Sequence, residues 1–276
     1  MTDSAAAAAR AASFLGLHKP GAPLLMPNAW DAGSARVLAT LGFAALATTS
    51  SGFAATLGRL DGNVSRDEEL ANAAAIAGAT DLPVSADLED CFAADPAGVA
   101  ETVTQAAGTG LAGLSVEDYS RRDDDPIFDR VLAAERVAAA AQAAHGGPVR
   151  LVLTARAENY LHGRPDLADT IARLQSFQEA GADVLYAPGL RTADDIRAVV
   201  TSVDRPVNVL AWPGGLSVAD LAELGAGRIS VGGSLAFAAL GSLAVTARDM
   251  LESGTFGFGA DAAAGRDIIA RAFPAS

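Results

Sequence analysis

The stretch TGLAGLSVE, residues 109–117, decides the fold. It follows an Ala-rich helical segment, passes through a glycine and continues as a short apolar run. Glycine supplies the left-handed conformation that ends a helix, and a run this apolar is typical of a strand buried on both faces of a parallel sheet. The stretch is therefore a helix-to-strand junction. Similar junctions recur at residues 41–46, 180–185 and 224–229.

Eight such strand-forming runs follow one another along the chain, each succeeded by a helical stretch. In a chain of 276 residues, this alternation predicts a closed (β/α)₈ barrel, which has ~250 residues, rather than an open doubly wound sheet. No Gly-x-Gly-x-x-Gly follows the first run, so the usual dinucleotide fingerprint is missing. We predict strands at 24–27, 44–48, 84–87, 113–117, 151–155, 184–186, 207–209 and 229–231.

We predict a single domain over residues 1–276, with the barrel at about 23–252 and a C-terminal helical extension at about 255–276. Within this extension, residues 260–273 have a helical pattern. Residues 229–247 carry no charge, and their length alone would suit a membrane span. Because two glycines interrupt this segment, we interpret it as a buried strand, a glycine turn and a core-facing helix.

The charge of the chain restricts its partners. It has 33 acidic and 20 basic residues, a formal net charge of -13, so we expect neither nucleic acid nor a membrane as a partner. Its one lysine, Lys19, precedes the first strand, which excludes a Schiff-base aldolase, a pyridoxal phosphate enzyme and a Walker-type loop. A single cysteine, Cys91, and the lack of a secretory pattern near the start favour the cytoplasm.

Acidic side chains follow strands three and four. In a barrel, the chemistry takes place at the carboxyl ends of the strands. The period of two places Asp87 and Glu89 on one face, and Glu117 ends the neighbouring strand, about 4.8 Å away. Three carboxylates in a dry site need a counter-charge, and no lysine provides one. We therefore predict Mg²⁺ at this cluster, with Mn²⁺ as the alternative metal. The other interpretation is that these acids cap helices or pair with arginines.

Three further strand ends carry candidate side chains. Arg156, after strand five, offers a two-pronged donor to a substrate carboxylate, or else pairs with Glu117 or Glu158. His162, in the following loop, is a candidate proton donor. Residues 48–53, TTSSGF, have backbone amides suited to a carboxylate. From their places at strand ends we add Ser51 and Asn208 to the substrate-binding set.

Taken together, several motifs resemble the isocitrate lyase and phosphoenolpyruvate mutase superfamily, over about residues 23–256. The resemblance implies a barrel that binds Mg²⁺ and a small 2-oxo acid or its enolate, and makes or breaks a carbon–carbon or carbon–phosphorus bond at C3. It also implies a homo-oligomer, a dimer or tetramer, often with a C-terminal helix exchanged between subunits. The motifs are PNAWD (27–31), TTSSGF (48–53), LGRLD (57–61), DLE (87–89), VED (116–118) and TAR (154–156).

The resemblance implies roles one residue at a time. Asp87 matches the direct metal ligand, and Glu89 and Glu117 match acids that hold the metal through water. The resemblance also implies substrate-side roles: Gly52 and Phe53 supply amides that receive the substrate carboxylate, Asp61 is an acid near the metal, and Arg156 binds substrate.

The loop after strand four departs from the superfamily. The lyases have a Lys-x-Cys-Gly-His loop there, whereas this chain reads YSRRDDDP, residues 119–126. The cysteine acid or base of the lyases and the gating lysine expected of the mutases are therefore both missing from the loop. We expect Tyr119, Tyr160, His162 or a metal-bound water to move the proton, beside Arg156 and Glu117. Cys91 stands where the superfamily usually has glycine, and it could line the mouth of the barrel.

Three functions are consistent with these residues. The first is a carbon–carbon lyase or phosphonate mutase. The second is a decarboxylase or hydrolase of a 2-oxo diacid such as oxaloacetate, which needs only the enolate-stabilising metal site. The third is a barrel that binds the acid without turning it over. The altered loop favours the second over a methylisocitrate-type lyase, and the metal site argues against the third.

Overall fold

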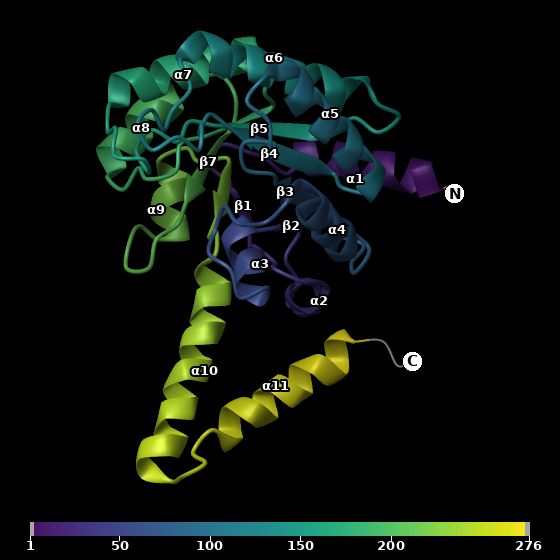
Figure 1. Ribbon diagram of the computed structural model, residues 1–276, viewed down its shortest axis with the longest axis vertical. Coiled ribbons are helices and arrows are strands. Elements are labelled where there is room, and N and C mark those ends of the chain that lie inside the picture. The colour runs from purple at the N-terminus through teal and green to yellow at the C-terminus, as the bar shows by residue number, and fades with distance from the viewer. Residues whose placement is uncertain (1–2, 274–276) are drawn as a thin grey trace.

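The computed structural model describes residues 3–273 as strands that alternate with helices (Figure 1). The strands are β1 (Leu24–Met26), β2 (Leu46–Ala47), β3 (Val84–Asp87), β4 (Gly113–Glu117), β5 (Val152–Arg156), β6 (Val184–Tyr186), β7 (Val207–Leu210) and β8 (Arg228–Ser230). The helices are α1 (Asp3–Gly16), α2 (Ala32–Thr40), α3 (Ser50–Thr56), α4 (Arg66–Ala77), α5 (Pro96–Ala106), the 3₁₀ turn η1 (Ala107–Thr109), α6 (Arg130–Gly146), α7 (Leu167–Glu179), α8 (Ala193–Thr201), α9 (Val218–Glu223), α10 (Ser234–Ser253) and α11 (Gly259–Ala272).

The eight strands form one parallel sheet in the order β1-β8-β7-β6-β5-β4-β3-β2. Backbone hydrogen bonds close the ring between its ends. The Ala47 amide donates to the Pro27 carbonyl at 2.9 Å, and the Ala29 amide donates to the Ala47 carbonyl at 2.7 Å. The predicted (β/α)₈ barrel is confirmed, with each strand within two residues of its predicted bounds.

The junction glycines explain the regular alternation. Gly42, Gly110, Gly181 and Gly225 all have positive φ, between 84° and 106°. This left-handed conformation costs glycine little and any other residue more. Each glycine therefore ends a helix at a fixed place and turns the chain into the next strand.

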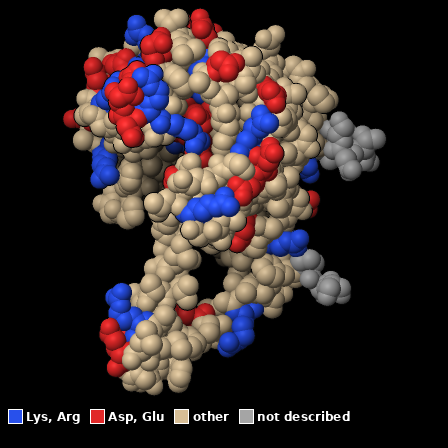
Figure 2. All heavy atoms as spheres, in the orientation of Figure 1, with Lys and Arg blue, Asp and Glu red and all other residues tan. Residues whose placement is uncertain are grey.

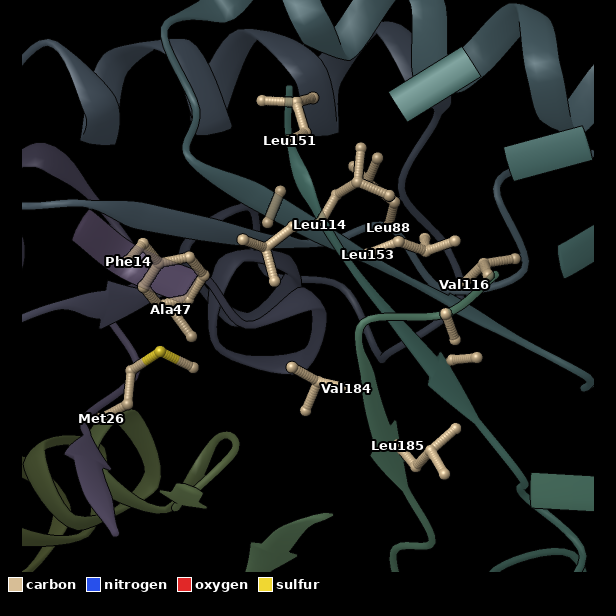
Figure 3. Packing of buried hydrophobic residues seen from close by; sticks show 14 of the residues in the cluster. Phe14, Met26, Ala47, Leu88, Leu114, Val116, Leu151, Leu153, Val184 and Leu185 are labelled. Atoms are coloured by element: carbon tan, nitrogen blue, oxygen red, sulfur yellow. The ribbon is translucent and has the colours of Figure 1, made fainter. Parts of the chain in front are cut away.

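The apolar core lies between the outer face of the barrel and the surrounding helices. Leu114 and Val116 on β4, and Leu153 on β5, are at most 1% exposed (Figure 3). Because successive side chains of a strand point to opposite faces, these residues alternate with polar ones such as Ser115 and Arg156, which face the barrel axis. The inside of the barrel is therefore polar toward the carboxyl ends of the strands.

Helix α1 covers the amino-terminal end of the barrel. The side chain of Phe14 is fully buried against the start of β4. A Cβ atom on Gly113 would lie 2.9 Å from the Phe14 ring and 2.7 Å from the Val152 carbonyl oxygen, so only glycine fits there. Access to the barrel is thus left to the carboxyl ends of the strands.

Helix α10 leaves the barrel, and α11 returns toward α2 (Figure 1). The predicted terminal helix at 260–273 is confirmed, but the expectation of a core-facing helix after β8 is wrong. Ala236 is the one buried residue of α10, and its exposed side chains include Phe237, Leu240 and Leu243. Much of this exposed surface is uncharged (Figure 2). Within residues 3–273, α10 alone has the length and apolar composition to cross a membrane, a test that some helices of soluble proteins also pass.

Candidate active site

Two neighbouring cavities open at the carboxyl ends of the strands, and both are lined by Ser50, Asp61 and Arg156. The first, here called the inner cavity, has a volume of about 350 Å³. The second, here called the acidic cavity, has about 490 Å³. The inner cavity is further lined by residues that include Asp87, Tyr186, Arg228 and Ser230. The acidic cavity is further lined by residues that include Glu89, Glu117, Tyr119, Arg121, Glu158 and His162.

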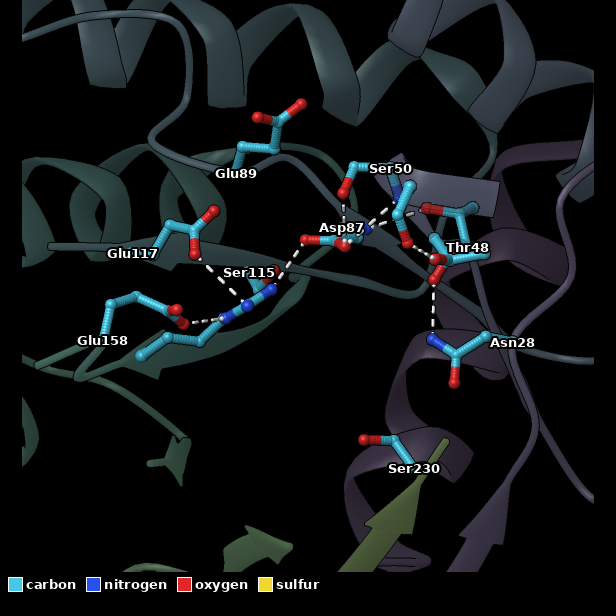
Figure 4. A network of polar contacts seen from close by, with 12 residues as sticks. Asn28, Thr48, Ser50, Asp87, Glu89, Ser115, Glu117, Glu158 and Ser230 are labelled. Atoms are coloured by element: carbon cyan, nitrogen blue, oxygen red, sulfur yellow. Dashed lines mark hydrogen bonds and ion pairs between the residues drawn. The ribbon is translucent and has the colours of Figure 1, made fainter. Parts of the chain in front are cut away.

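Arg156, the last residue of β5, lines both cavities and binds three carboxylates. These carboxylates belong to Asp87, Glu117 and Glu158, which Figure 4 labels. Arg156 Nη1 lies 2.8 Å from Asp87 Oδ1, its Nη2 lies 3.2 Å from Glu117 Oε2, and its Nε lies 2.8 Å from Glu158 Oε1. The guanidinium also lies over the Tyr186 ring, 5.0 Å from its centre. Arg156 therefore supplies the counter-charge for which the sequence offers no lysine at a strand end. The alternative role predicted for Arg156, a buried ion pair with Glu117 or Glu158, is present.

Asp87 is oriented by the turn that follows β2. Its Oδ2 accepts hydrogen bonds from the Ser50 amide at 3.3 Å and the Ser50 hydroxyl at 3.2 Å. Its own amide donates to Thr48 Oγ1 at 2.9 Å. The hydroxyl-rich motif after β2 thus fixes the carboxylate that was predicted to be the direct metal ligand.

Glu89 is held by Arg121, which lies in the loop after β4. Strand β3 ends at Asp87, and Glu89 has a φ of 50°, so the period of two does not extend to Glu89. Its Oε2 lies 2.8 Å from Arg121 Nη2, and Asp90 Oδ2 lies 2.9 Å from Arg121 Nε. Arg121 itself has a φ of 60°. Left-handed conformations of this kind cost about 1–3 kcal/mol each and concentrate at functional sites.

Glu69 on α4 adds a carboxyl group that the sequence analysis missed. It is fully buried, and neither side-chain oxygen has a hydrogen-bond partner among the described residues. Burial, followed by the charges of Asp87, Glu89 and Asp61, raises the pKa of Glu69 to about 9. A signal was present, because the helical period places Glu69 on the same face as buried Ala73 and Ile76.

The site has more negative charge than its arginines neutralise. Burial raises the pKa of Glu89 to about 7, although Arg121 opposes the shift, and burial raises the pKa of Glu117 despite Arg156. Glu89 Oε1 has no hydrogen-bond partner within residues 3–273. The surrounding carboxyl groups, which outnumber Arg121 and Arg156, are Asp61, Glu69, Asp87, Glu89, Asp90, Glu117 and Glu158.

These oxygen donors fit a hard divalent cation, which would relieve the excess negative charge. Across residues 3–273, no three His, Cys, Asp or Glu side chains converge closely enough to hold an ion in their present rotamers. Asp87, Glu89 and Glu117 are instead directed at arginines. A metal at this site requires at least some of these ion pairs to be exchanged.

All four predicted catalytic residues, Arg156, Glu117, Tyr119 and His162, line the acidic cavity. The rings of Tyr119 and His162 are stacked, with centres 3.9 Å apart and planes inclined by 7°. Burial lowers the pKa of His162, and the nearby Glu158 opposes this shift. The imidazole is therefore mainly neutral near pH 7.

The predicted substrate-binding residues divide between the cavities and their walls. Ser51 and Asp61 line the inner cavity. Gly52 and Phe53 lie in α3 and line neither cavity. The Gly52 amide donates to Thr49 Oγ1 at 3.4 Å, and the Phe53 amide donates to the Thr49 carbonyl at 3.0 Å.

Asn208 takes part in the inner cavity through its neighbours. Its Oδ1 accepts from Arg228 Nε at 2.9 Å, and its Nδ2 donates to Ser230 Oγ at 2.9 Å. Arg228, Ser230 and Tyr186 were not predicted as site residues. Arg228 fell one residue outside the predicted eighth strand, and Tyr186 ends a strand that carried no other polar signal.

Cys91 is enclosed and does not line the mouth of the barrel. Its thiol lies 3.9 Å from the Ser115 carbonyl, and burial raises its pKa although Arg136 is nearby. Its φ of 57° explains why glycine suits this position. The expectation that Cys91 could line the mouth is therefore wrong.

Comparisons with known proteins agree with this geometry. Residues 14–251 match the family described as phosphoenolpyruvate phosphomutase. A crystal structure from Burkholderia cenocepacia J2315, provisionally described as a lyase/mutase, is 51% identical with a TM-score of 0.92, covering 96% of this chain and 95% of that one. An uncharacterized protein of Mycobacterium tuberculosis is 36% identical over 80% of this chain and 81% of its own length. A phosphonopyruvate hydrolase complex with oxalate and Mg²⁺ is 25% identical with a TM-score of 0.79, covering 95% and 91%.

Proposed function

The chain belongs to the phosphoenolpyruvate phosphomutase family, and on that premise we propose that it is a Mg²⁺-dependent enzyme acting on a small 2-oxo acid. Family membership makes it an enzyme of the lyase or mutase type that acts on a carbon–carbon or carbon–phosphorus bond. We propose that this bond is at C3 of the 2-oxo acid, where an enolate forms or is consumed. A barrel that binds the acid without turnover is not retained, because the matched family and the curated relatives with named activities are mutases or lyases.

One observation carries this proposal: Arg156 holds Asp87 of the inner cavity and Glu117 of the acidic cavity at the same time. A substrate carboxylate that binds this guanidinium takes the place of Asp87, one of its carboxylate partners. Asp87 is then free to bind a cation while Ser50 keeps it oriented. Substrate and metal therefore favour each other's binding at this site.

Asp87 would bind the metal directly, and Glu89 and Glu117 would hold it through water. When bound, Mg²⁺ would stabilise the negative charge of an enolate by polarising the 2-oxo oxygen. The related phosphonopyruvate hydrolase complex with oxalate and Mg²⁺ supports this assignment, with Mn²⁺ as the alternative ion.

We propose that one of two side chains that line the acidic cavity moves a proton at C3. Tyr119 and His162 line this cavity, whereas Tyr160, the other side chain considered, does not. Because burial disfavours the protonated form of His162, we assign the proton transfer to the Tyr119 hydroxyl. The stacked imidazole of His162 would fix the Tyr119 ring.

Within this chemistry, cleavage of a 2-oxo diacid is favoured over a methylisocitrate-type lyase reaction. The Cys91 thiol is enclosed away from both cavities. The loop after β4 offers the acidic cavity Tyr119 and Arg121 instead of a thiol. A reaction that needs a thiol acid or base has no such group here, while one that needs only enolate stabilisation and a hydroxyl is supported.

The direct test incubates the protein and Mg²⁺ with oxaloacetate, phosphonopyruvate or 2-methylisocitrate. Turnover is measured as release of the 2-oxo acid or of its cleavage products. Asp87→Ala should reduce turnover at least ~100-fold and abolish the rise in Tm that Mg²⁺ causes. The control, Glu135→Gln, changes an exposed acid on α6 and should leave both unchanged. If no compound reacts and the Mg²⁺ effect survives Asp87→Ala, the proposed function is wrong.

We also propose that the arm formed by α10 and α11 packs against a second copy of the chain. Its exposed apolar side chains form a larger uncharged surface than an isolated subunit normally keeps in water. Light scattering should show a dimer or tetramer, and Leu243→Asp on the arm should reduce the mass, whereas Leu60→Asp on the barrel surface should not. A wild-type monomer, or co-flotation with phosphatidylcholine vesicles, would contradict this proposal.

A further inference from the structure

A second cation lies inside the barrel, in the same row of residues as Arg156. The strand register pairs Glu117 with Arg156, Arg156 with Tyr186, Tyr186 with Asn208, and Asn208 with Arg228. Side chains paired in this way on neighbouring parallel strands point to the same face of the sheet. Arg228 therefore points into the barrel, where it lines the inner cavity while only 3% of it is exposed.

Arg228 differs from Arg156 in having no carboxylate partner among the described residues. Its Nε donates to Asn208 Oδ1 at 2.9 Å, and its Nη1 lies 3.3 Å from His18 Nε2. His18 Nδ1 lies 2.9 Å from the Phe14 carbonyl, so it must carry the proton, and Nε2 is left as an acceptor. Both partners of the guanidinium are therefore neutral.

The positive charge of Arg228 persists in these surroundings. Burial and the charge of Arg228 lower the pKa of His18 to about 3, which keeps its imidazole neutral. Burial, with a further contribution from Arg156, lowers the pKa of Arg228 to about 10, which still leaves it charged near pH 7. A buried cation without a counter-ion is costly, so an anion in the inner cavity is stabilised.

Two hydroxyl groups complete an arrangement of donors around this cation. Ser230 Oγ accepts a hydrogen bond from Asn208 Nδ2 and lies within hydrogen-bond reach of the Tyr186 hydroxyl, so one of these two hydroxyls can donate to the other and the other to an anion in the cavity. Ser230 and Tyr186 both line the inner cavity with Arg228. The guanidinium and the hydroxyl that donates into the cavity match the two oxygens of a carboxylate.

We propose that Arg228, with Ser230 and Tyr186, forms an anion subsite that binds the second carboxylate of a small 2-oxo dicarboxylate. This subsite rests on the proposed function, in which Arg156 and Asp87 receive the 2-oxo acid end. Both ends line the same cavity, and its volume of about 350 Å³ suits a small molecule that contacts both. The negative charges of Asp87 and Asp61 at one end repel the distal carboxylate and favour its binding at the other.

The test compares two compounds that differ at the distal group. Oxaloacetate carries a carboxylate there, and 4-methyl-2-oxopentanoate carries an isopropyl group of similar shape. With Mg²⁺ present, competition against oxalate should show oxaloacetate binding at least about tenfold more tightly to the wild type. Arg228→Met should remove this preference, and Arg228→Lys should restore part of it.

Oxalate itself is the matched control, because it occupies only the Arg156 and Asp87 end. Its Kd should change less than about twofold in Arg228→Met. Equal weakening of oxalate, or an unchanged preference for oxaloacetate, would refute the subsite. If Arg228→Met does not fold, Ser230→Ala must lower the preference, and an unchanged preference in Ser230→Ala would also refute it.

Two further outcomes separate this inference from the proposed function and from a different anion. If oxalate does not bind to the wild type with Mg²⁺, the proposed function itself is wrong. If oxalate binds but oxaloacetate has no advantage, only the subsite is wrong. A larger effect of Arg228→Met on phosphonopyruvate than on oxaloacetate would assign the subsite to a phosphonate and overturn the carboxylate form.

Discussion

The two cavities use arginine in opposite ways. On the acidic side, Arg156 and Arg121 are surrounded by carboxylates that outnumber them. On the β7–β8 side, Arg228 has only an amide oxygen and a neutral imidazole. The first region has surplus negative charge and the second has surplus positive charge. The barrel therefore favours a ligand set with a cation at one end and an anion at the other.

The largest effect that tests this comparison is the removal of each buried arginine. Arg156→Met leaves carboxylates without a partner, so we expect loss of turnover and a decrease of about 3–5 kcal/mol in the free energy of unfolding. Arg228→Met removes an unneutralised cation and should decrease the free energy of unfolding clearly less than Arg156→Met does. Urea denaturation at pH 8 with a chelator measures both. Equal losses of unfolding free energy in the two variants would contradict the comparison. The control is Arg197→Met, which changes an exposed side chain and should alter stability by less than ~1 kcal/mol.

A smaller effect sharpens the description of the acidic side. Glu69 has a pKa of about 9 in the folded protein and 4.5 ordinarily. Between these values the folded state binds more protons, so this stabilising contribution is complete below about pH 4.5 and is lost as pH rises toward 9. The free energy of unfolding of Glu69→Gln should therefore exceed that of the wild type by on the order of 2 kcal/mol at pH 6 and match it near pH 4.

Chelator-treated protein, unfolded in urea at both pH values, provides this measurement. The exposed Glu135→Gln serves as the control and should follow the wild type at each pH. A Glu69→Gln variant whose advantage does not grow with pH would show that burial among the acids of this site does not keep Glu69 protonated.

The smallest effect concerns the backbone that positions the acids. Cys91 has a φ of 57°, which glycine adopts without penalty, but glycine also loses the packing of the buried thiol. These terms oppose each other, so Cys91→Gly should change stability by less than about 1 kcal/mol. Cys91→Val, which is β-branched, should lose about 1–3 kcal/mol at the same φ. Thermal unfolding of the two variants provides the measurement. A Cys91→Val variant as stable as Cys91→Gly would contradict this account.

Most of the fold was predictable from local signals. The junction glycines and the apolar runs after them depend only on residues close in sequence, and every strand was found within two residues of its bounds. The core-facing helix was predicted wrongly because an apolar composition does not say what covers it. The α10 segment has the composition of a core helix, but residues 3–273 bring no packing partner to most of its surface.

The candidate site was predicted in part. The motifs predicted Asp87, Glu117, Arg156, Tyr119 and His162 at the carboxyl ends of the strands, where the structure places them around two neighbouring cavities. The arginines were underestimated as counter-charges, because composition alone does not show which cations reach the carboxylates. Arg121 was noted only as part of an altered loop, and its contact with Glu89 spans residues 32 positions apart.

The barrel, its strands and the polar residues at their carboxyl ends could be predicted from the chain alone, because strand period, helix termination and motif spacing are encoded by near neighbours. Which charges meet depends on the folded arrangement. Closure of the ring aligns Arg156 with Asp87 and Glu117, buries Glu69 among acids and leaves Arg228 with neutral partners. Electrostatic energy depends on distance through space and on burial, and neither is fixed until the eight strands have closed around a common axis.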